Sequence, residues 1–572
     1  MAVAAAPSVP LNLSISYYVK TFNFTWSASA TATSYQLYED VDGPGVGGFV
    51  AVGGTVAATS TSYVVSPLLH RRLNARYAVQ ACNAGGCSAS SVFVVPDLTR
   101  AIGYMKASNT RAAGEFGRGV ALSADGTTLA VGASGESSGS SGINGNQADA
   151  SAAAAGAVHV FVRNAGIWTQ QAYIKASNAR AGALFGDHVS LSADGNTLAV
   201  GASEENSNAT GINGNQADAS AVRAGAVYVF VRSGAAWTQQ AYVKASNARQ
   251  EQRFGSYVSL SADGNTMGVT APFEASNATG INGNQADISA TGAGAAYVFI
   301  RSGGTWTQQA YLKASNAQGG DVFGSMALSA DGNTMAVGAQ HEDSGATGIN
   351  GNQTDESAAS AGALYVFVRS GAVWTQQAYL KASNARAGAQ FGSNAALSAD
   401  GNTLAVGAFR ENSAAAGING NQADTSASNA GAVYVFIRAG AVWSQQAYVK
   451  ASNARSGFNF AQPALSADGN TMAVGAVFED SNATGIGGNQ ADASADNAGA
   501  VYVFTRTAGN WTQQAYVKAS NTRTDATFGA VVLSADGNTM AVGSAGESSN
   551  ATGVMGNQAD SSASRAGAVY LY

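Results

Sequence analysis

The sequence predicts an all-β protein in which a seven-bladed β-propeller follows a small β-sandwich. One unit of sequence is written seven times, each unit reads as four short strands, and residues 7–97 follow a different, non-repeating pattern. Internal repetition at a fixed period is a strong fold signal, because each unit must bury its apolar face against the next one.

The repeated unit opens with Y-x-K-A-S-N and runs through F-G, L-S-A-D-G-N-T, A-V-G-A, N-Q-A-D, G-A-V-Y-V-F and W-T-Q-Q-A. It recurs every 68 or 69 residues. The seven units begin at Tyr104, Tyr173, Tyr242, Tyr311, Tyr379, Tyr448 and Tyr516. A catalytic centre needs one special place, whereas this array offers seven equivalent ones. The repetition therefore favours binding over catalysis.

The second unit shows how each repeat divides into strands. Residues 185–191, Thr197–Ala202, Ala226–Val231 and Trp237–Lys244 are rich in Val, Tyr, Phe and small residues, as suits a pleated and packed surface. The first two strands are joined by the tight-turn sequence at 193–196, A-D-G-N. No segment has the pattern of an amphipathic helix. Four-stranded antiparallel units repeated around an axis are propeller blades.

The two ends of the array predict how the ring closes. The seventh unit stops at Tyr572, within its third strand, and residues 100–106 before the first F-G resemble the missing fourth strand. We therefore expect strand 100–106 to complete the last blade, which leaves no open sheet edge. Thr99 stands where the other copies of this strand have Trp.

Residues 7–97 are predicted to form a separate domain, and residues 1–6 are interpreted as the remnant of a trimmed leader. The alternating pattern around Trp26, Tyr35 and Tyr77 suggests a small β-sandwich. Cys82 and Cys87, the only cysteines of the chain, lie in C-N-A-G-G-C on a predicted hairpin. We expect a local disulfide between them, which fits a secreted protein; two free loop thiols are the alternative.

The F-G pair and the A-V-G-A and G-A-V-Y-V-F strands resemble FG-GAP repeats, the units of the integrin α-subunit propeller. The resemblance covers residues 98–572, with departures at Phe460-Ala461 and at residues 269–272. It implies a propeller of the adhesion type. Integrin-type repeats also carry a D-x-D-x-D-G calcium loop, but this chain has only S-A-D-G-N-T there, so that metal site is not carried over. The amino-terminal domain is similar to a fibronectin type III domain, which implies a spacer or adhesive module.

Composition excludes several function classes. The net charge is −6, only 11% of the residues are charged, and no basic stripe is present, so nucleic acid is not an expected partner. No apolar run reaches the ~20 residues of a membrane-spanning helix. The four histidines do not recur at one repeat position, and no nucleophile elbow follows a strand. We therefore predict that the protein is not an enzyme and has no catalytic residues.

Two acids recur in the long loop between the second and third strands of every unit. A Glu follows the second strand, and an Asp thirteen residues later closes N-Q-x-D. The pairs are Glu136/Asp149, Glu205/Asp218, Glu274/Asp287, Glu342/Asp355, Glu411/Asp424, Glu479/Asp492 and Glu547/Asp560. With nearby amide and carbonyl oxygens, these carboxylates are the ligand types of a hard cation such as calcium.

A second interpretation of the acids is structural. Each unit also has a Lys at the end of the fourth strand, and six units have an Arg shortly after it, so Glu–Lys and Asp–Arg pairs could pin the loops. Asp can also cap a turn through its own backbone. The sequence favours loop pinning over calcium, since the carboxylates are few. We expect such pairs to be exposed and to contribute about 0–1 kcal/mol each.

We therefore predict a secreted or cell-surface protein that recognises a protein or a surface glycan without catalysis. The long-loop face is the expected site, because long loops vary freely on a rigid scaffold. One alternative is a multivalent lectin, since seven equal sites suit avidity. Another alternative is a purely structural component of an envelope or filament.

Overall fold

The computed structural model describes residues 5–44, 47–65 and 68–572, and within them the fold is all-β. The described residues form nine sheets, with two short 3₁₀ helices as the regular exceptions. No helix in the described part of the chain has the length and apolar character needed to cross a membrane.

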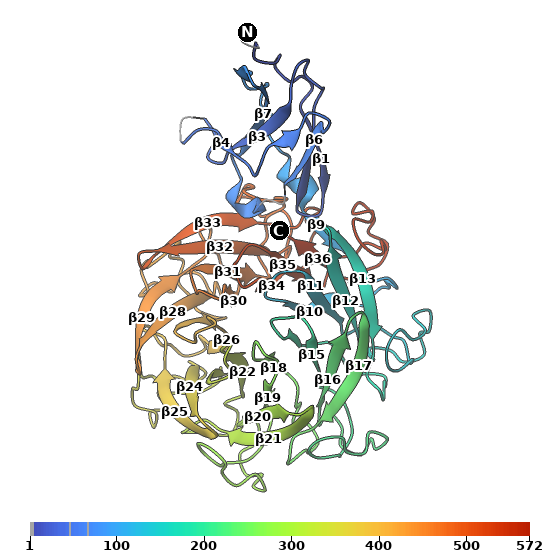
Figure 1. The fold of residues 1–572 in the computed structure, drawn as a ribbon. Coiled ribbons are helices and arrows are strands. Elements are labelled where there is room, and N and C mark those ends of the chain that lie inside the picture. The colour runs from blue at the N-terminus through green and yellow to red at the C-terminus, as the bar shows by residue number, and fades with distance from the viewer. Residues whose placement is uncertain (1–4, 45–46, 66–67) are drawn as a thin grey trace.

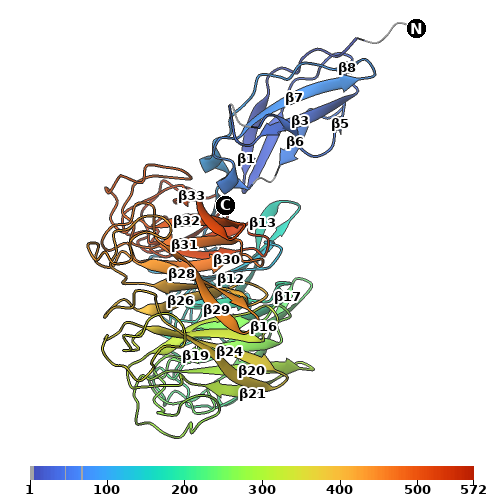
Figure 2. The same cartoon turned by 90° about the vertical axis from the view of Figure 1, so that its left-hand side faces the viewer.

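The amino-terminal region contains two small sheets that pack face to face (Figure 2). One has the order β1-β2-β6; the other has the order β4-β3-β7-β8, with β5 also pairing with β3. The elements are β1 (Ser14–Tyr18), β2 (Thr21–Thr25), β3 (Ser34–Asp40), β4 (Val50–Ala51), β5 (Val56–Ala57), β6 (Ser62–Val65), η1 (Leu69–Arg71), β7 (Arg76–Asn83), β8 (Gly86–Cys87) and η2 (Leu98–Ala101). Phe22, Phe24, Trp26, Tyr35 and Tyr77 fill the space between the sheets.

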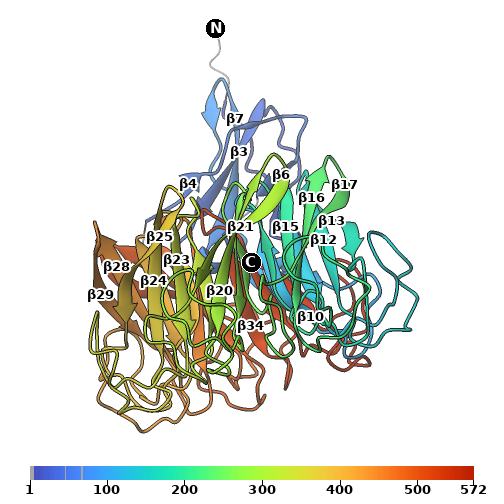
Figure 3. The ribbon, with the colours of Figure 1, turned by 90° about the horizontal axis from the view of Figure 1, so that it is seen from below.

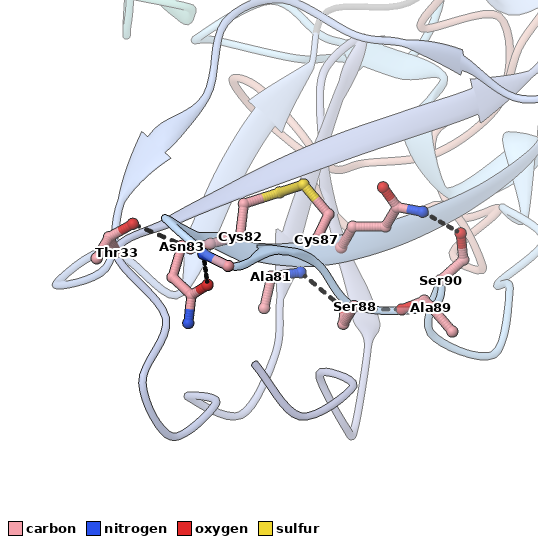
Figure 4. Close-up of a disulfide and its surroundings, with 10 residues drawn as sticks. Thr33, Ala81, Cys82, Asn83, Cys87, Ser88, Ala89 and Ser90 are labelled. Carbon is pink, nitrogen blue, oxygen red and sulfur yellow. Dashed lines mark hydrogen bonds between the residues drawn. A yellow bond between two sulfur atoms is a disulfide. The ribbon is translucent and has the colours of Figure 1, made fainter. Parts of the chain in front are cut away.

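The predicted disulfide joins Cys82 and Cys87, which face each other across the β7–β8 hairpin (Figure 4). The hairpin is further held by the Ser88 hydroxyl, which accepts a hydrogen bond from the Ala81 main-chain N–H at 3.1 Å. The disulfide therefore fastens the edge of one sheet of the amino-terminal region.

Residues 103–572 form seven four-stranded antiparallel sheets, here called repeat sheets 1 to 7. Their strands are β10 (Phe116–Leu122), β11 (Thr128–Ala133), β12 (Ala157–Asn164) and β13 (Ile167–Ile174); β14 (Val189–Leu191), β15 (Thr197–Ala202), β16 (Ala226–Ser233) and β17 (Ala236–Val243); β18 (Val258–Leu260), β19 (Thr266–Ala271), β20 (Ala295–Ser302) and β21 (Thr305–Leu312); β22 (Phe323–Leu328), β23 (Thr334–Ala339), β24 (Ala363–Ser370) and β25 (Val373–Leu380); β26 (Phe391–Leu397), β27 (Thr403–Ala408), β28 (Ala432–Ala439) and β29 (Val442–Val449); β30 (Phe460–Leu465), β31 (Thr471–Ala476), β32 (Ala500–Thr507) and β33 (Asn510–Val517); and β34 (Phe528–Leu533), β35 (Met540–Ser544), β36 (Ala568–Leu571) and β9 (Gly103–Met105).

The repeat sheets stand side by side around a centre, an arrangement consistent with a β-propeller (Figure 1). The first strand of each sheet contacts the first strand of the next, and β34 contacts β10. The tight A-D-G-N turns add a closed circle of main-chain hydrogen bonds of 2.8–3.0 Å, in which each turn's N–H donates to the carbonyl of the next turn. The circle runs through Ala124, Ala193, Ala262, Ala330, Ala399, Ala467, Ala535 and back to Ala124.

The last repeat sheet combines the two ends of the array. β9 pairs with β36, and Tyr104 lies opposite Tyr570. The strand is shorter than the predicted 100–106, because η2 occupies its first residues and the Asp97 side chain caps that helix by accepting from the Thr99 N–H. The carboxyl terminus therefore lies beside the base of the amino-terminal domain (Figures 1 and 2).

Five junctions, those between the first six repeat sheets, share one side-chain clamp. At the first of them, the Trp237 indole N–H and the Arg232 guanidinium both donate to Gln171 of the preceding sheet, at 3.0 and 3.2 Å. Arg232 also reaches Thr128 of that sheet and lies over the Trp237 ring. The equivalent pairs are Arg301/Trp306, Arg369/Trp374, Arg438/Trp443 and Arg506/Trp511.

The amino-terminal domain packs on repeat sheet 7, where this clamp is altered. Lys20 donates through Nζ to the Asn538 carbonyl at 2.6 Å and to the Thr539 hydroxyl at 2.9 Å. Val19 packs with Met105 and Leu571. A Cβ on residue 103 would approach Val19 to 2.6 Å, so Gly103 makes room for this contact. The amino-terminal region and repeat sheet 7 therefore share one continuous core.

Candidate functional site

The seven predicted glutamates lie in buried ion pairs with the seven predicted lysines. The Nζ–Oε2 distances are 2.7–3.0 Å, and no side chain of the set is more than 4% exposed. The pairs are Glu136–Lys175, Glu205–Lys244, Glu274–Lys313, Glu342–Lys381, Glu411–Lys450, Glu479–Lys518 and Glu547–Lys106. The last pair joins the two ends of the array.

The carboxylate of each glutamate is fully used by its neighbours, as repeat sheet 2 shows. Glu205 accepts from Lys244 and the Tyr242 hydroxyl on one oxygen and from the Asn178 amide on the other. Burial lowers the pKa of Lys244, and the attraction of Glu205 opposes that shift. The expectation of exposed pairs was wrong, because the long loop folds back over the strand ends. A buried pair is costly to break, at about 3–5 kcal/mol when one partner is removed.

The seven predicted aspartates cap turns in the same long loop. Asp218 accepts from the Ser220 N–H at 2.9 Å and from the Asn208 N–H at 3.1 Å. Hydrogen bonds from Ser220 are the main reason why the pKa of Asp218 is lowered. The equivalent caps are at Asp149, Asp287, Asp355, Asp424, Asp492 and Asp560.

The expected Asp–Arg pairs are replaced by a different contact. Arg180 donates to the main-chain carbonyls of Asp218 and Gln216, at 2.7 and 3.0 Å, rather than to the carboxylate. The carboxylate already faces the turn N–H groups, so the guanidinium meets the outer carbonyls of the loop.

These acids do not fit a calcium site as they are folded. The glutamate oxygens accept from lysine and asparagine, and the ammonium group beside each carboxylate would repel a second cation. In the described part of the chain, no group of three or more His, Cys, Asp or Glu side chains is placed to hold a metal ion.

The aromatic series is also structural. The six tryptophans of the fourth strands are 3–6% exposed, and five indole N–H groups donate to the preceding sheet. The phenylalanine of each F-G position is fully buried. The tryptophan rings therefore offer no open plane on which a sugar could stack.

One set of residues that differ among the seven copies lines one mouth of the central channel. They lie directly after the F-G pair and, in units 3 to 7, within the two residues before the glutamate, where the strands meet the long loops. They surround a cavity of about 1240 Å³ to which all seven repeat sheets contribute. After the F-G pair the copies carry Arg118, Asp187, Ser256, Ser325, Ser393, Gln462 and Ala530.

The channel mouth was not predicted as a site from the sequence, although the differences between the seven copies could have indicated it. Aligning the seven copies with one another shows that the framework repeats while the positions flanking F-G and preceding Glu vary. The long-loop face was predicted, and Figures 2 and 3 show the long loops gathered on one side of the ring. Only the fold brings the seven variable positions together around one opening.

One half of the channel mouth carries ion pairs between neighbouring sheets. Arg118 pairs with Asp187 at 3.0 Å, Arg253 pairs with Glu204 at 3.2 Å, and Arg565 pairs with Glu115. The other half, formed by repeat sheets 4 to 6, is uncharged in its lining and contains Phe409, Phe478 and Gln462. The channel mouth therefore has one charged half and one uncharged half.

Below the rim most of the side chains that line the channel are apolar. Its walls are the first strands of the seven sheets, with side chains such as Val189, Leu328 and Leu533 around a space of about 420 Å³. His188, near the top of this wall, stacks on Tyr257 with ring centroids 4.8 Å apart. Its Nδ1 accepts from the Val258 N–H, and desolvation lowers the pKa of His188 to about 4, so the ring is neutral at pH 7.

Comparison with known families identifies the repeats. The family described as FG-GAP repeat matches residues 168–230, 306–367 and 374–436. FG-GAP repeats therefore occur in three places in this chain. No curated protein gives a significant match to the sequence.

Solved structures give similarities of low identity. A putative 6-phosphogluconolactonase from Bacteroides uniformis is 11% identical, with 71% of this chain and 86% of that chain covered and a TM-score of 0.39. The periplasmic gluconolactonase PpgL of Pseudomonas aeruginosa is 14% identical, with 85% and 96% covered and a TM-score of 0.38. Sqt1 of Chaetomium thermophilum, bound to the N-terminus of ribosomal protein L10, is 12% identical, with 78% and 85% covered and a TM-score of 0.39. Similarities at these TM-scores carry no argument here.

Proposed function

Because this chain carries FG-GAP repeats, we propose that it is an extracellular recognition protein that binds a protein partner at the channel mouth. In this proposal, repeat sheets 1 to 7 are the blades of a seven-bladed propeller. The amino-terminal domain is a fibronectin type III-like module, supported by its three-stranded and five-stranded sheets and by the central Trp26 and Tyr35.

A single observation carries the proposal. The seven copies keep the same strands, ion pairs and turn caps, and five junctions keep the same clamp, but the copies differ where they line the cavity of about 1240 Å³. Because the residues around the channel mouth differ from copy to copy, the mouth is a single, asymmetric surface in each molecule. Variable residues on a rigid scaffold are the usual arrangement of a recognition site.

The same observation argues against seven equivalent sites. The tryptophans are buried, and the recurring acids are taken by lysines, amides and turn N–H groups. A multivalent lectin would need seven similar exposed surfaces. We therefore favour a protein partner over the glycan alternative.

The absence of catalysis is part of the proposal. His188, the histidine that lines the channel mouth, is engaged with Tyr257 and the Val258 main chain rather than with a nucleophile. The extracellular location is supported by the Cys82–Cys87 disulfide, because disulfides persist in oxidising compartments.

The test is selection of ligands with and without an obstructed channel mouth. Random peptides displayed on phage, and a glycan array with and without calcium, are presented to the wild-type protein. Binders are then compared on Ala530→Trp, which places a large uncharged side chain in the channel mouth, and on Ala235→Trp, the same change in an exposed turn at the other end of the strands. We expect peptide binders that weaken by about tenfold or more on the first variant alone.

Two outcomes would contradict the proposed function. One is a set of binders that tolerates Ala530→Trp as well as Ala235→Trp, which would place recognition elsewhere. The other is calcium-dependent binding confined to glycans, which would favour the lectin alternative.

A further inference from the structure

We propose that the channel mouth takes an acidic polypeptide segment, with its carboxylates on the arginines of the charged half and an apolar side chain entering the channel. This inference rests on the proposed function and specifies its partner. It is carried by the unequal exposure of the ion pairs and by the apolar wall beneath them.

In each ion pair at the channel mouth, the arginine is the more exposed partner. The side chains of Arg118 and Asp187 are 57% and 25% exposed, those of Arg565 and Glu115 are 65% and 22% exposed, and those of Arg253 and Glu204 are 35% and 15% exposed. The carboxylates are set back and the guanidinium groups face outward. The more exposed charge of each of these three pairs is therefore positive, although the chain as a whole carries −6.

These arginines retain the capacity to bind a further carboxylate. A guanidinium has five N–H donors in a planar fork, and each of these ion pairs needs only one or two of them. Arg118 donates to Asp187 through Nε, and Arg565 donates to Glu115 through one Nη. An incoming carboxylate can accept from the remaining donors without breaking the existing pair, and such charge-assisted bonds are among the stronger ones.

An exposed acid in the lining determines on which side of the channel mouth the acidic residues of the partner can lie. Asp525, in repeat sheet 7, accepts from the Asn497 amide and also faces the cavity. A carboxylate of the partner would be repelled there. The acidic residues of the partner are therefore expected over Arg118 and Arg253, between sheets 1 and 3.

The uncharged half and the channel favour a polypeptide over an acidic glycan. Phe409 and Phe478 line the cavity beside Ser393, Asn394 and Gln462, and most side chains of the wall below are Val, Leu, Met and Ala. A sugar would bring hydroxyl groups that find few partners on this wall, and burying a polar group without a hydrogen bond is unfavourable. A polypeptide partner with an apolar side chain next to an acidic one would contact both the uncharged and the charged half of the channel mouth.

The test measures binding of defined probes by fluorescence anisotropy. The probe is a short fluorescent peptide of alternating Asp and Leu; the comparison probes replace Asp by Lys or Leu by Ser, and polygalacturonate represents an acidic glycan. The variants are Arg118→Gln together with Arg253→Gln, and the control is Arg71→Gln, an exposed arginine on the amino-terminal domain. Thermal unfolding checks that each variant is folded.

We expect the Asp/Leu peptide to bind best and to lose about tenfold or more in affinity in the double variant, with the control unchanged. Equal binding of the Lys/Leu peptide would overturn the charge assignment. Equal binding of the Asp/Ser peptide or of polygalacturonate would overturn the assignment of an apolar side chain and a polypeptide. If no acidic probe binds while selected peptides of another composition still depend on the channel mouth, this inference fails and the proposed function stands.

Discussion

Two kinds of junction hold the repeat sheets together, and they are built by different means. The junctions between the first six sheets repeat one clamp, in which Trp237 and Arg232, for example, meet on Gln171. At repeat sheet 7, Ile102 stands at the Gln171 position and Thr99 at the tryptophan position. There the amino-terminal domain brings Val19 and Lys20 to the last sheet instead.

The difference shows how a repeat array closes on itself. Lys20 contacts the Asn538 carbonyl and the Thr539 hydroxyl. In repeat sheet 2 the corresponding groups, the Asn196 carbonyl and the Thr197 hydroxyl, accept from the Arg232 main-chain N–H and the Arg301 side chain. A segment from another domain thus supplies contacts that the repeat sequence supplies elsewhere. The amino-terminal domain is therefore part of the closure and is more than a spacer.

The largest effect is expected from truncations at the closure. Deleting residues 1–107 removes β9 and Lys106, which exposes the edge of β36 and leaves Glu547 buried without its cation. The unpaired carboxylate alone is expected to cost about 3–5 kcal/mol. Deleting residues 1–96 removes only Val19, Lys20 and their domain, so the free energy of unfolding should fall by less.

Thermal and denaturant unfolding of the two truncated proteins measures this difference. If both truncations unfold at the same temperature, β9 does not close the ring. If the shorter deletion leaves the wild-type stability unchanged, the amino-terminal domain takes no part in the closure.

The next effect concerns the ion pairs, which should behave alike at internal and closing positions. Glu205→Gln and Glu547→Gln each leave a buried lysine without its partner and are expected to cost about 3–5 kcal/mol. Glu251→Gln is the control, because that side chain is 53% exposed and its pair spans 3.6 Å, so a change within about 0.5 kcal/mol is expected.

Urea unfolding with and without a chelator checks the ion-pair prediction. We expect the chelator to have no effect on the wild type, because lysine fills the place of a cation. A chelator-dependent fall in the melting temperature that Glu205→Gln abolishes would instead establish a calcium site in the long loops.

A pH-dependent effect is expected at Lys20. Burial, with repulsion from Arg163, lowers the pKa of Lys20 to about 7 from 10.5. The unfolded chain therefore binds more protons between these values. The contribution of Lys20 to stability should rise as the pH rises from 7 to 10.5, by at most about 1.4 kcal/mol per pH unit.

Lys20→Met isolates this contribution, because the other titrating groups are common to both proteins. The difference in the free energy of unfolding between wild type and variant should shift in favour of the wild type as the pH rises. A difference that stays constant from pH 7 to 10 would show that Lys20 keeps an ordinary pKa and is not buried at the closure.

The smallest effect is expected at His159, which stands where the six other copies have Tyr in the same strand. In repeat sheet 2 the equivalent Tyr228 hydroxyl donates to Asn178, whereas the Asn109 carbonyl oxygen of repeat sheet 1 and His159 Nε2 have no protein partner. His159→Tyr should restore the missing hydrogen bond and stabilise the protein by about 0.5–1.5 kcal/mol.

Tyr228→His is the matched control and should lower the free energy of unfolding by a similar amount, because it leaves Asn178 in the state of Asn109. Differential scanning calorimetry compares the two. A loss of stability in His159→Tyr would show that the space beside Asn109 cannot take a phenol.

The sequence by itself determined the repeated architecture. Period, strand pattern and turn residues are local properties, so the seven four-stranded units, the A-D-G-N turns, the disulfide and the pairing of the chain ends could be predicted from Val, Tyr, Gly and Cys positions alone. The recurrence of Glu with Lys also indicated that these residues act together, because both recur in all seven units.

Tertiary structure decided what surrounds those residues. The burial of Glu205 and Lys244, the turn cap by Asp218 and the contact of Arg180 with carbonyls depend on how the long loop folds back, which spacing does not encode. Lys20 and Asn538 are 518 residues apart in sequence, and Arg118, Asp187 and Phe478 belong to separate units. Closure of the ring alone places them together, because it brings the same edge of every sheet to one opening.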